Sequence, residues 1–232
     1  WIVQTAASDN NWTSICWSDN LNLGVAVSNS GTNNRIMTTN NGINWTSQIS
    51  PADNNWTSVC RGRIDVGLLT EKEIFVAVSN SGTNRVMISY DGINWTTQLA
   101  ASNNNWTSVC WSVHLNLFVA VSNTGTNDRV MTSPDGITWT GRTEAEANQW
   151  KSIAWSPELG LFCAVSATGT NRVMTSPDGI TWTSRSAAEA NFWTNIEWSP
   201  ELGLFCSVAI NGTNRVMTSP DGITWTARSA AE

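Results

Sequence analysis

The chain has little charge and few of the side chains that enzymes use in acid–base chemistry. Its 232 residues include one histidine, one tyrosine and only 12 lysine and arginine residues together, and the net charge is −6. An acidic chain with so few cations lacks the basic surface that binds nucleic acid. No stretch approaches the roughly 18 consecutive apolar residues of a membrane-spanning helix. Neither nucleic-acid binding nor a membrane span is therefore predicted.

Cysteine is also scarce, and its placement favours a structural role. Five cysteines are an odd number, so at least one has no partner within the chain. They fall at two repeat positions, which are Cys16, Cys60 and Cys110, and Cys163 and Cys206. Small buried thiols are the simpler interpretation. Metal binding is the alternative, but the sequence has neither Cys-Xaa-Xaa-Cys spacing nor supporting histidines, so we predict no metal and no cofactor.

Nothing in this chain predicts a compartment. It opens on Trp1, and no signal-like segment is visible in it. A processed chain and a piece of a longer protein both stay open at this point, and a soluble domain is expected.

Tryptophan, in contrast, is abundant and regularly spaced. Of the 15 tryptophans, one series follows an Asn-Xaa pair and recurs after 44, 50, 44 and 43 residues: Trp12, Trp56, Trp106, Trp150 and Trp193. A second series recurs after a Gly-Ile turn: Trp45, Trp95, Trp139, Trp182 and Trp225. These spacings define five sequence repeats, near residues 12–55, 56–105, 106–149, 150–192 and 193–232. Residues 1–11 align with a fourth strand and its connection, in excess of the five repeats.

Each repeat contains four short segments typical of strands. In the fourth repeat these are residues 150–155, 161–166, 172–176 and 180–185. The first alternates between two faces, the second is a short apolar run, and Gly, Pro, Asn or Asp separates the segments. Four antiparallel strands in about 44 residues form the unit of a propeller blade. The sequence therefore predicts an all-β, single-domain, five-bladed β-propeller of four-stranded antiparallel blades. A stacked solenoid is the rival architecture.

A short motif between the third and fourth strands resembles a known repeat family. Ser-Pro-Asp-Gly-Ile-Thr-Trp occurs at residues 133–139, 176–182 and 219–225. It resembles the Asp-box of lectin-type and other propellers, with one residue fewer between Asp and Gly. In that family the box is structural, so the resemblance implies that Asp91, Asp135, Asp178 and Asp221 brace turns. The family includes sialidases, lectins, receptor ectodomains and assembly factors, so the motif indicates fold more than function.

Catalysis is not predicted. Sialidases that share the box also need an arginine cluster, a tyrosine and a glutamate at the ring centre, and here Tyr90 lies in a turn. His114 lies in a loop without a serine and aspartate around it. The second repeat departs most, because residues 61–75 lengthen its first connection by about six residues. A tolerated surface insertion is the simpler interpretation, and a partner-specific protrusion that breaks the symmetry is the alternative.

Binding is the function that repeated polar loops favour. In an antiparallel blade the second and fourth connections lie on one face, so that face collects a threonine, two amides and a guanidinium from each repeat beside a tryptophan. This mixture suits a sugar. The candidate ligand-binding residues are Thr32, Asn33, Arg35, Thr83, Asn84, Arg85, Thr126, Asn127, Arg129, Thr170, Asn171, Arg172, Thr213, Asn214, Arg215, Asn10, Asn54, Asn104, Asn148 and Asn191.

The same residues also fit a purely structural role. The arginines begin the third strand and would pair with Asp53, Glu146 or Glu189 across a blade boundary, while asparagine tolerates left-handed loop geometry. The sequence thus predicts a non-catalytic, multivalent, lectin-like propeller with glycans as partners. The alternative is a structural or protein-interaction propeller of a larger assembly, such as a virion or appendage.

The two ends of the chain compete for one position in a closed ring. Residues 223–229 form a local hairpin, which costs less loop-closure entropy than recruiting the distant residues 1–5. We therefore expect residues 223–229 to hold the edge of the last blade. Residues 1–5 would then add a fifth strand to that blade or be donated to a neighbouring molecule, which would give self-association.

Overall fold

The protein folds entirely into antiparallel sheets. The computed structural model describes residues 2–65 and 71–230, and all regular structure in these ranges is β-strand. There are 20 strands in five sheets of four. The strands are β1 (Trp12–Ser18), β2 (Leu23–Ser28), β3 (Ile36–Thr39), β4 (Thr46–Gln48), β5 (Trp56–Asp65), β6 (Glu71–Ser79), β7 (Val86–Ser89), β8 (Thr96–Gln98), β9 (Trp106–Ser112), β10 (Leu117–Ser122), β11 (Val130–Ser133), β12 (Thr140–Arg142), β13 (Trp150–Ser156), β14 (Leu161–Ser166), β15 (Val173–Ser176), β16 (Thr183–Arg185), β17 (Trp193–Ser199), β18 (Leu204–Ala209), β19 (Val216–Ser219) and β20 (Thr226–Arg228).

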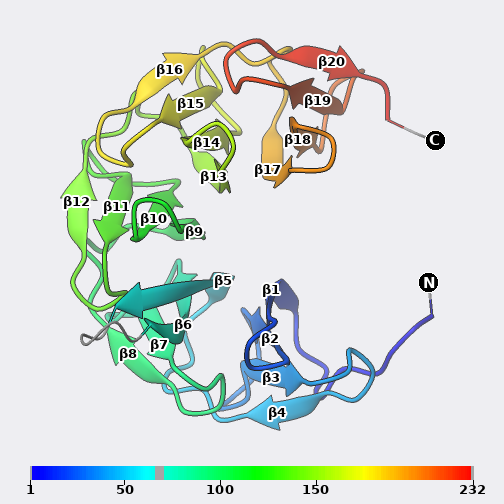
Figure 1. Ribbon diagram of the computed structural model, residues 1–232, viewed down its shortest axis with the longest axis vertical. Coiled ribbons are helices and arrows are strands. Elements are labelled where there is room, and N and C mark those ends of the chain that lie inside the picture. The colour runs from blue at the N-terminus through cyan, green and yellow to red at the C-terminus, as the bar shows by residue number, and fades with distance from the viewer. Residues whose placement is uncertain (1, 66–70, 231–232) are drawn as a thin grey trace.

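The five sheets are arranged around a common axis like the blades of a propeller (Figure 1). Each sheet runs in chain order, with its first strand nearest the axis and its fourth strand at the periphery. We number the blades I to V in chain order. This arrangement confirms the predicted all-β, five-bladed fold of four-stranded antiparallel blades.

Apolar clusters between successive blades hold the arrangement together. Between blades III and IV, Val119 and Val121 of β10 pack with Trp150, Phe162 and other residues of blade IV. Trp150 and Phe162 are fully buried. Since each inner sheet has a neighbour on both faces, its second strand is a continuous apolar run without polar alternation. In β14 this run is buried from its second residue to its last.

In blades II to V, a tryptophan of the second series donates a hydrogen bond to the turn that precedes the fourth strand. The Nε1–H of Trp139 donates a hydrogen bond of 2.9 Å to the carbonyl of Gly136 in the preceding turn. Asp135 Oδ1 in that turn accepts the backbone N–H groups of Ile137 and Thr138, both at 2.8 Å. The fourth strand begins one residue after the tryptophan, at Thr140 in blade III. The sequence-based prediction that this tryptophan lies within the fourth strand was therefore wrong, because its indole folds back onto the turn.

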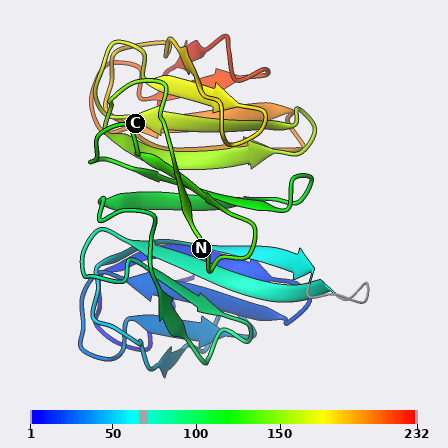
Figure 2. The same cartoon turned by 90° about the vertical axis from the view of Figure 1, so that its left-hand side faces the viewer.

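The propeller is open between blades V and I. Figure 1 shows a gap between β1 and β17, whereas each other pair of successive blades is in contact. Figure 2 shows the stacking of the contacting blades from the side. The side chain of Ile15, on the face of blade I that borders the gap, is 60% exposed. The closed ring expected from the sequence is therefore not formed, and the five blades describe an arc.

The ends of the chain follow only part of the prediction. β20 pairs with β19, so the local C-terminal hairpin forms the outer edge of blade V as expected. Residues 2–5 are exposed and belong to no strand, so they add no fifth strand to that blade. Trp1 lies outside the described residues. In the second repeat the insertion extends the β5–β6 hairpin, in which β5 has 10 residues and β6 has 9. Residues 66–70 of this insertion lie outside the described part.

Candidate functional site

The predicted asparagines before the inner strands form hydrogen bonds to a loop of their own blade. The Nδ2 of the asparagine two residues before each inner strand donates to a backbone carbonyl of the loop between the second and third strands of the same blade. In blades I to V these donors are Asn10, Asn54, Asn104, Asn148 and Asn191, at 2.9, 2.6, 2.9, 2.6 and 2.7 Å. The glycine of each loop lies against this amide, as Gly169 does against Asn148, and takes a positive φ. One donor of each of these amides is therefore engaged within its own blade.

The predicted loop arginines join successive blades. Nε of Arg85 donates to the carbonyl of Gly82 in its own loop at 2.9 Å, and Nη1 reaches the carbonyl of Asn104 in blade III at 2.8 Å. The equivalent inter-blade bonds of Arg35, Arg129 and Arg172 measure 2.8, 2.6 and 2.8 Å. This tie gives the arginine at this repeat position a structural role in blades I to IV.

The expected ion pairs of these arginines form only in part. Arg35 lies 3.6 Å from Asp53, as predicted, and Arg129 pairs with Glu144 at 3.4 Å. Glu146 and Glu189 instead accept the side-chain amides of Asn171 and Asn214. Asn33 and Asn127 adopt left-handed backbone conformations, with φ of 58° and 59°. The predicted loop threonines are all exposed: Thr32, Thr83, Thr126, Thr170 and Thr213. The structure thus brings the predicted set onto one face, but engages its strongest donors within the fold.

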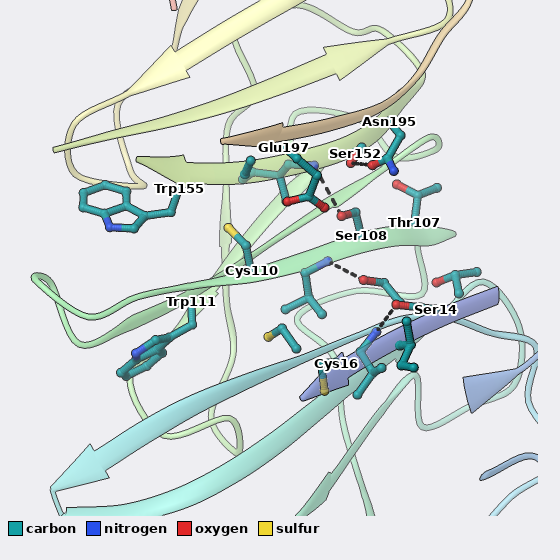
Figure 3. A pocket seen from close by; sticks show the side chains of 18 of the residues that line it. Ser14, Cys16, Thr107, Ser108, Cys110, Trp111, Ser152, Trp155, Asn195 and Glu197 are labelled. Atoms are coloured by element: carbon teal, nitrogen blue, oxygen red, sulfur yellow. Dashed lines mark hydrogen bonds between the residues drawn. The ribbon is translucent and has the colours of Figure 1, made fainter. Parts of the chain in front are cut away.

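A cavity of about 730 Å³ lies on the propeller axis and is lined by the innermost strand of every blade. Figure 3 shows its layout along the axis. Ser14, Ser108, Ser152 and Asn195 gather toward one end, and Trp111 and Trp155 lie at the other. Cys110 and Glu197 lie between the two groups. The cavity therefore has a polar end and an aromatic end.

Hydroxyl groups at the polar end form hydrogen bonds between the inner strands of successive blades. Thr57 Oγ1 donates to the carbonyl of Trp106 in the next blade at 2.8 Å, and Thr13 and Thr107 do the same one blade earlier and one later. Ser58 Oγ accepts the backbone N–H of Val109 at 3.2 Å. Ser14, Ser108 and Ser152 accept equivalent bonds. In blade IV the threonine position is occupied by Lys151, which also lines the cavity.

Indole rings line the aromatic end. Trp17, Trp111, Trp155 and Trp198 occupy one position in four blades, and Arg61 replaces them in blade II. Trp111 packs on Phe118 with ring centroids 4.3 Å apart, and Trp155 packs on Phe162 at 4.4 Å. Trp198 packs likewise on Phe205 at 4.8 Å, so one side of these three rings contacts its own blade while each tryptophan remains partly exposed. Four oriented aromatic surfaces and one guanidinium converge on the same cavity.

The titratable groups of the cavity are few. Burial raises the pKa of the Cys16 thiol to about 12 and raises those of Cys60 and Cys110 well above the usual range. These thiols therefore remain protonated at neutral pH and are poor nucleophiles and metal ligands. Burial also raises the pKa of Glu197. Glu197 is the sole carboxylate among the described residues lining the cavity. In the described part of the chain, no group of three or more potential metal ligands is found.

The remaining cysteines differ in burial, although they share a repeat position. All five are free thiols. Cys163 is buried between blades IV and V, whereas Cys206 is exposed. The expectation that every cysteine is a core thiol was therefore wrong for Cys206. The face of blade V that borders the gap has no neighbouring blade, so this thiol is exposed.

Comparison with known proteins identifies the fold and no closer relationship. No protein-family model matches the chain, and no curated protein matches it. Among solved structures, a chain of the nidogen/laminin complex has a TM-score of 0.63 at 11% identity, over 90% of this chain and 75% of that one. YCF48 bound to a D1 peptide has a TM-score of 0.64 at 16% identity, over 97% and 68%. The chain is a β-propeller.

A third similar structure shows that this likeness extends to enzymes. The GH74 enzyme of Niastella koreensis has a TM-score of 0.67 at 15% identity, over 92% of this chain and 38% of that one. Such low identities show the fold alone. Propellers similar to this one thus include chains from a protein complex, a peptide complex and a GH74 enzyme. The described part of the present chain contains no helix of the length and apolarity needed to cross a membrane.

Sequence reasoning did not select the cavity as a site. The signal was present, because Trp17, Trp111, Trp155 and Trp198 each follow the first tryptophan of their repeat by five residues. A β-bulge after the first tryptophan shifts the alternation of the inner strand, so both tryptophans of a repeat contact the same core cluster, as Trp150 and Trp155 do. The second tryptophan also borders the cavity. Only the closing of strands around an axis shows that the second set converges.

Proposed function

We propose that this propeller is a non-catalytic carbohydrate-binding module whose ligand site is the axial cavity. The observation that carries the proposal is the convergence of Trp17, Trp111, Trp155 and Trp198 on one cavity. Each indole offers a flat apolar surface suited to the C–H face of a sugar ring. Lys151, Glu197 and Arg61 also line the cavity and add charged donors and acceptors for hydroxyl groups.

The chemistry of the cavity argues for binding without hydrolysis. Glycoside hydrolysis ordinarily needs two carboxylates on opposite sides of the scissile bond. Glu197 is the single carboxylate lining the described cavity, and the neighbouring thiols are held protonated. A bound saccharide would therefore meet hydrogen-bonding groups and aromatic surfaces without an acid–base pair.

This proposal moves the sugar site from the five loops to the axis, and the two locations are separable by stoichiometry. A glycan-array screen followed by calorimetry on the best ligand should give one site per chain. Trp155→Ala and Trp111→Ala should weaken binding at least about tenfold, the scale of losing one stacked aromatic contact. Thr170→Ala and Thr126→Ala, in the exposed loops, serve as matched controls and should bind like the parent. Several sites per chain, abolished by the threonine variants, would return the site to the loops.

A polypeptide ligand is the second candidate function. It is favoured by a ring of exposed isoleucines, one in each Asp-Gly or Asn-Gly turn, at Ile43, Ile93, Ile137, Ile180 and Ile223. Repeated apolar side chains on one face of a propeller suit an interface with protein. A blank glycan array, together with a partner whose binding is lost in the double variant Ile137→Ser/Ile180→Ser, would favour this function over carbohydrate binding.

A further inference from the structure

The face of blade V that borders the gap has the same design as four buried faces elsewhere in the protein. In blade IV the corresponding face presents Cys163, Val165 and Val173, all fully buried against blade V. The equivalent residues of blade V are Cys206, Val208 and Val216. Cys206 is exposed, Val208 is 43% exposed, and Val216 is half-buried. We call this surface of blade V, together with Arg215 and Thr194, the open face.

Polar groups of the open face lack the partners that their equivalents have. Arg172 donates to the carbonyl of Asn191 in the next blade at 2.8 Å. Among the described residues, the equivalent Arg215 donates only to Gly212 of its own loop, at 3.1 Å, and its side chain is exposed. Thr57 donates to carbonyls of its own and the next blade, whereas Thr194 reaches only the carbonyl of Val208 in its own blade. Arg215 and Thr194 thus keep a bond within their own blade that Arg172 and Thr57 also make, but among the described residues they lack the bond to a following blade.

Blade I is a poor match for this open face. Every contact between successive blades contains a phenylalanine from the second strand of the later blade: Phe75, Phe118, Phe162 and Phe205, all fully buried. In blade I this position is Gly24, and a Cβ placed there would lie 3.0 Å from the indole of Trp17. Blade I of the same chain, or of a second copy, would therefore leave a void where each other contact has a phenyl ring.

We propose that the open face of blade V is a docking surface for a further four-stranded blade of this same repeat, one that carries the phenylalanine. Such a blade supplies a buried tryptophan, the phenyl ring and the asparagine carbonyl that Arg172 meets at the preceding contact. A second whole copy would bring four additional blades into a gap bounded on both sides by this chain (Figure 1). The proposal concerns assembly and does not depend on the carbohydrate site.

The thiol of Cys206 reports on this surface directly. In the unextended chain, Cys206 should react with a thiol reagent while Cys163 is protected by burial. The test appends one further copy of residues 190–232 to the full chain, in register, with the cysteine of the added copy replaced by serine. We expect the added blade to slow labelling of Cys206 at least about tenfold, as burial in a cooperative contact requires.

Two matched variants separate a specific contact from a nonspecific one. In the first, the added copy carries glycine at the position of Phe205, which imitates blade I and should restore rapid labelling. In the second, Arg215→Ala should speed labelling of Cys206 in the extended chain and leave labelling of the unextended chain unchanged. Circular dichroism should show added β-structure in the extended parent.

Three results would overturn the proposal. Cys206 as protected as Cys163 in the monomeric, unextended chain would mean that blade I closes the ring. Protection that grows with protein concentration, alongside a dimer in light scattering, would mean that a second copy covers the face. Labelling unaffected by the added repeat, or equally slowed by the glycine variant, would mean that the surface does not select this blade.

Discussion

Trp106 and Trp12 provide a matched pair that measures what the contact between blades contributes to stability. Both begin an inner strand, and the Nε1 of each donates to a carbonyl four residues earlier, at 3.1 Å in Trp106 and 3.2 Å in Trp12. Trp106 is fully buried between blades II and III, whereas Trp12 borders the gap and is half-buried. Replacing each with alanine therefore removes the same atoms and an equivalent hydrogen bond. The two substitutions differ in how deeply the removed side chain is buried.

The expected costs follow from that difference. Truncating a buried tryptophan costs about 3–5 kcal/mol, since transfer and cavity terms add. Trp106→Ala should therefore lower the free energy of unfolding by this amount. At the sensitivity of a chain of this size this corresponds to a fall in Tm of about 6–20 °C. Trp12→Ala should cost about half as much or less, because much of its ring already contacts solvent.

Urea unfolding followed by far-ultraviolet circular dichroism is the appropriate assay, because removing a tryptophan alters the fluorescence signal itself. The shift in midpoint at unchanged slope gives the change in unfolding free energy. Equal losses for the two variants would refute the reasoning, since they would show that the gap-facing side of blade I is covered in solution. A loss below about 1 kcal/mol for Trp106→Ala would instead contradict its placement in the core.

Three further predictions address the turns, the loops and the ties between blades. Burial opposes ionisation of Asp91, but hydrogen bonds from Asn94, Ile93 and Ser89 together lower its pKa from 3.8 to about 2. Stability from this carboxylate is complete above about pH 4 and is lost as the pH falls toward 2. The pKa values of Asp135, Asp178 and Asp221 are lowered by equivalent bonds against the same opposing burial. The urea midpoint should therefore decrease as the pH is lowered from 4 to 2. Replacing all four aspartates with asparagine should make this decrease smaller, and an unchanged pH profile would contradict the role of these turns. Arg172→Ala should destabilise the protein by about 1–2 kcal/mol through loss of its inter-blade carbonyl, and Arg215→Ala, its matched control, should cost less; the reverse order in denaturant titrations would be incompatible with the ties described. Gly169→Ala should lower Tm more than Gly160→Ala, because both have positive φ but only Gly169 lies against the side chain of another residue, Asn148, and equal melting temperatures would argue against that contact.

The architecture of a single blade was largely predictable from the sequence, and the candidate site was not. Repeat spacing, strand period and Asp-Gly turns are local properties, so they identified four antiparallel strands per repeat and the propeller fold. The predicted loop residues do gather on one face, but the arginines of blades I to IV and the asparagines before the inner strands donate to carbonyls within the fold. Hydrogen-bond partners such as Asn104 for Arg85 lie about half a repeat away in the next blade. The repeat pattern cannot tell such a partner from an external ligand.

Local pattern determined what each blade is, and tertiary structure alone decided how the blades meet. Cys163 and Cys206 occupy the same repeat position, yet one is buried and the other exposed. The difference depends on whether a neighbouring blade is present. Likewise, the spacing from Trp150 to Trp155 is a sequence property, but the convergence of such second tryptophans on one cavity follows from the packing of blades around an axis. Closure depends on the summed geometry of all contacts between blades, a long-range quantity that no single repeat encodes.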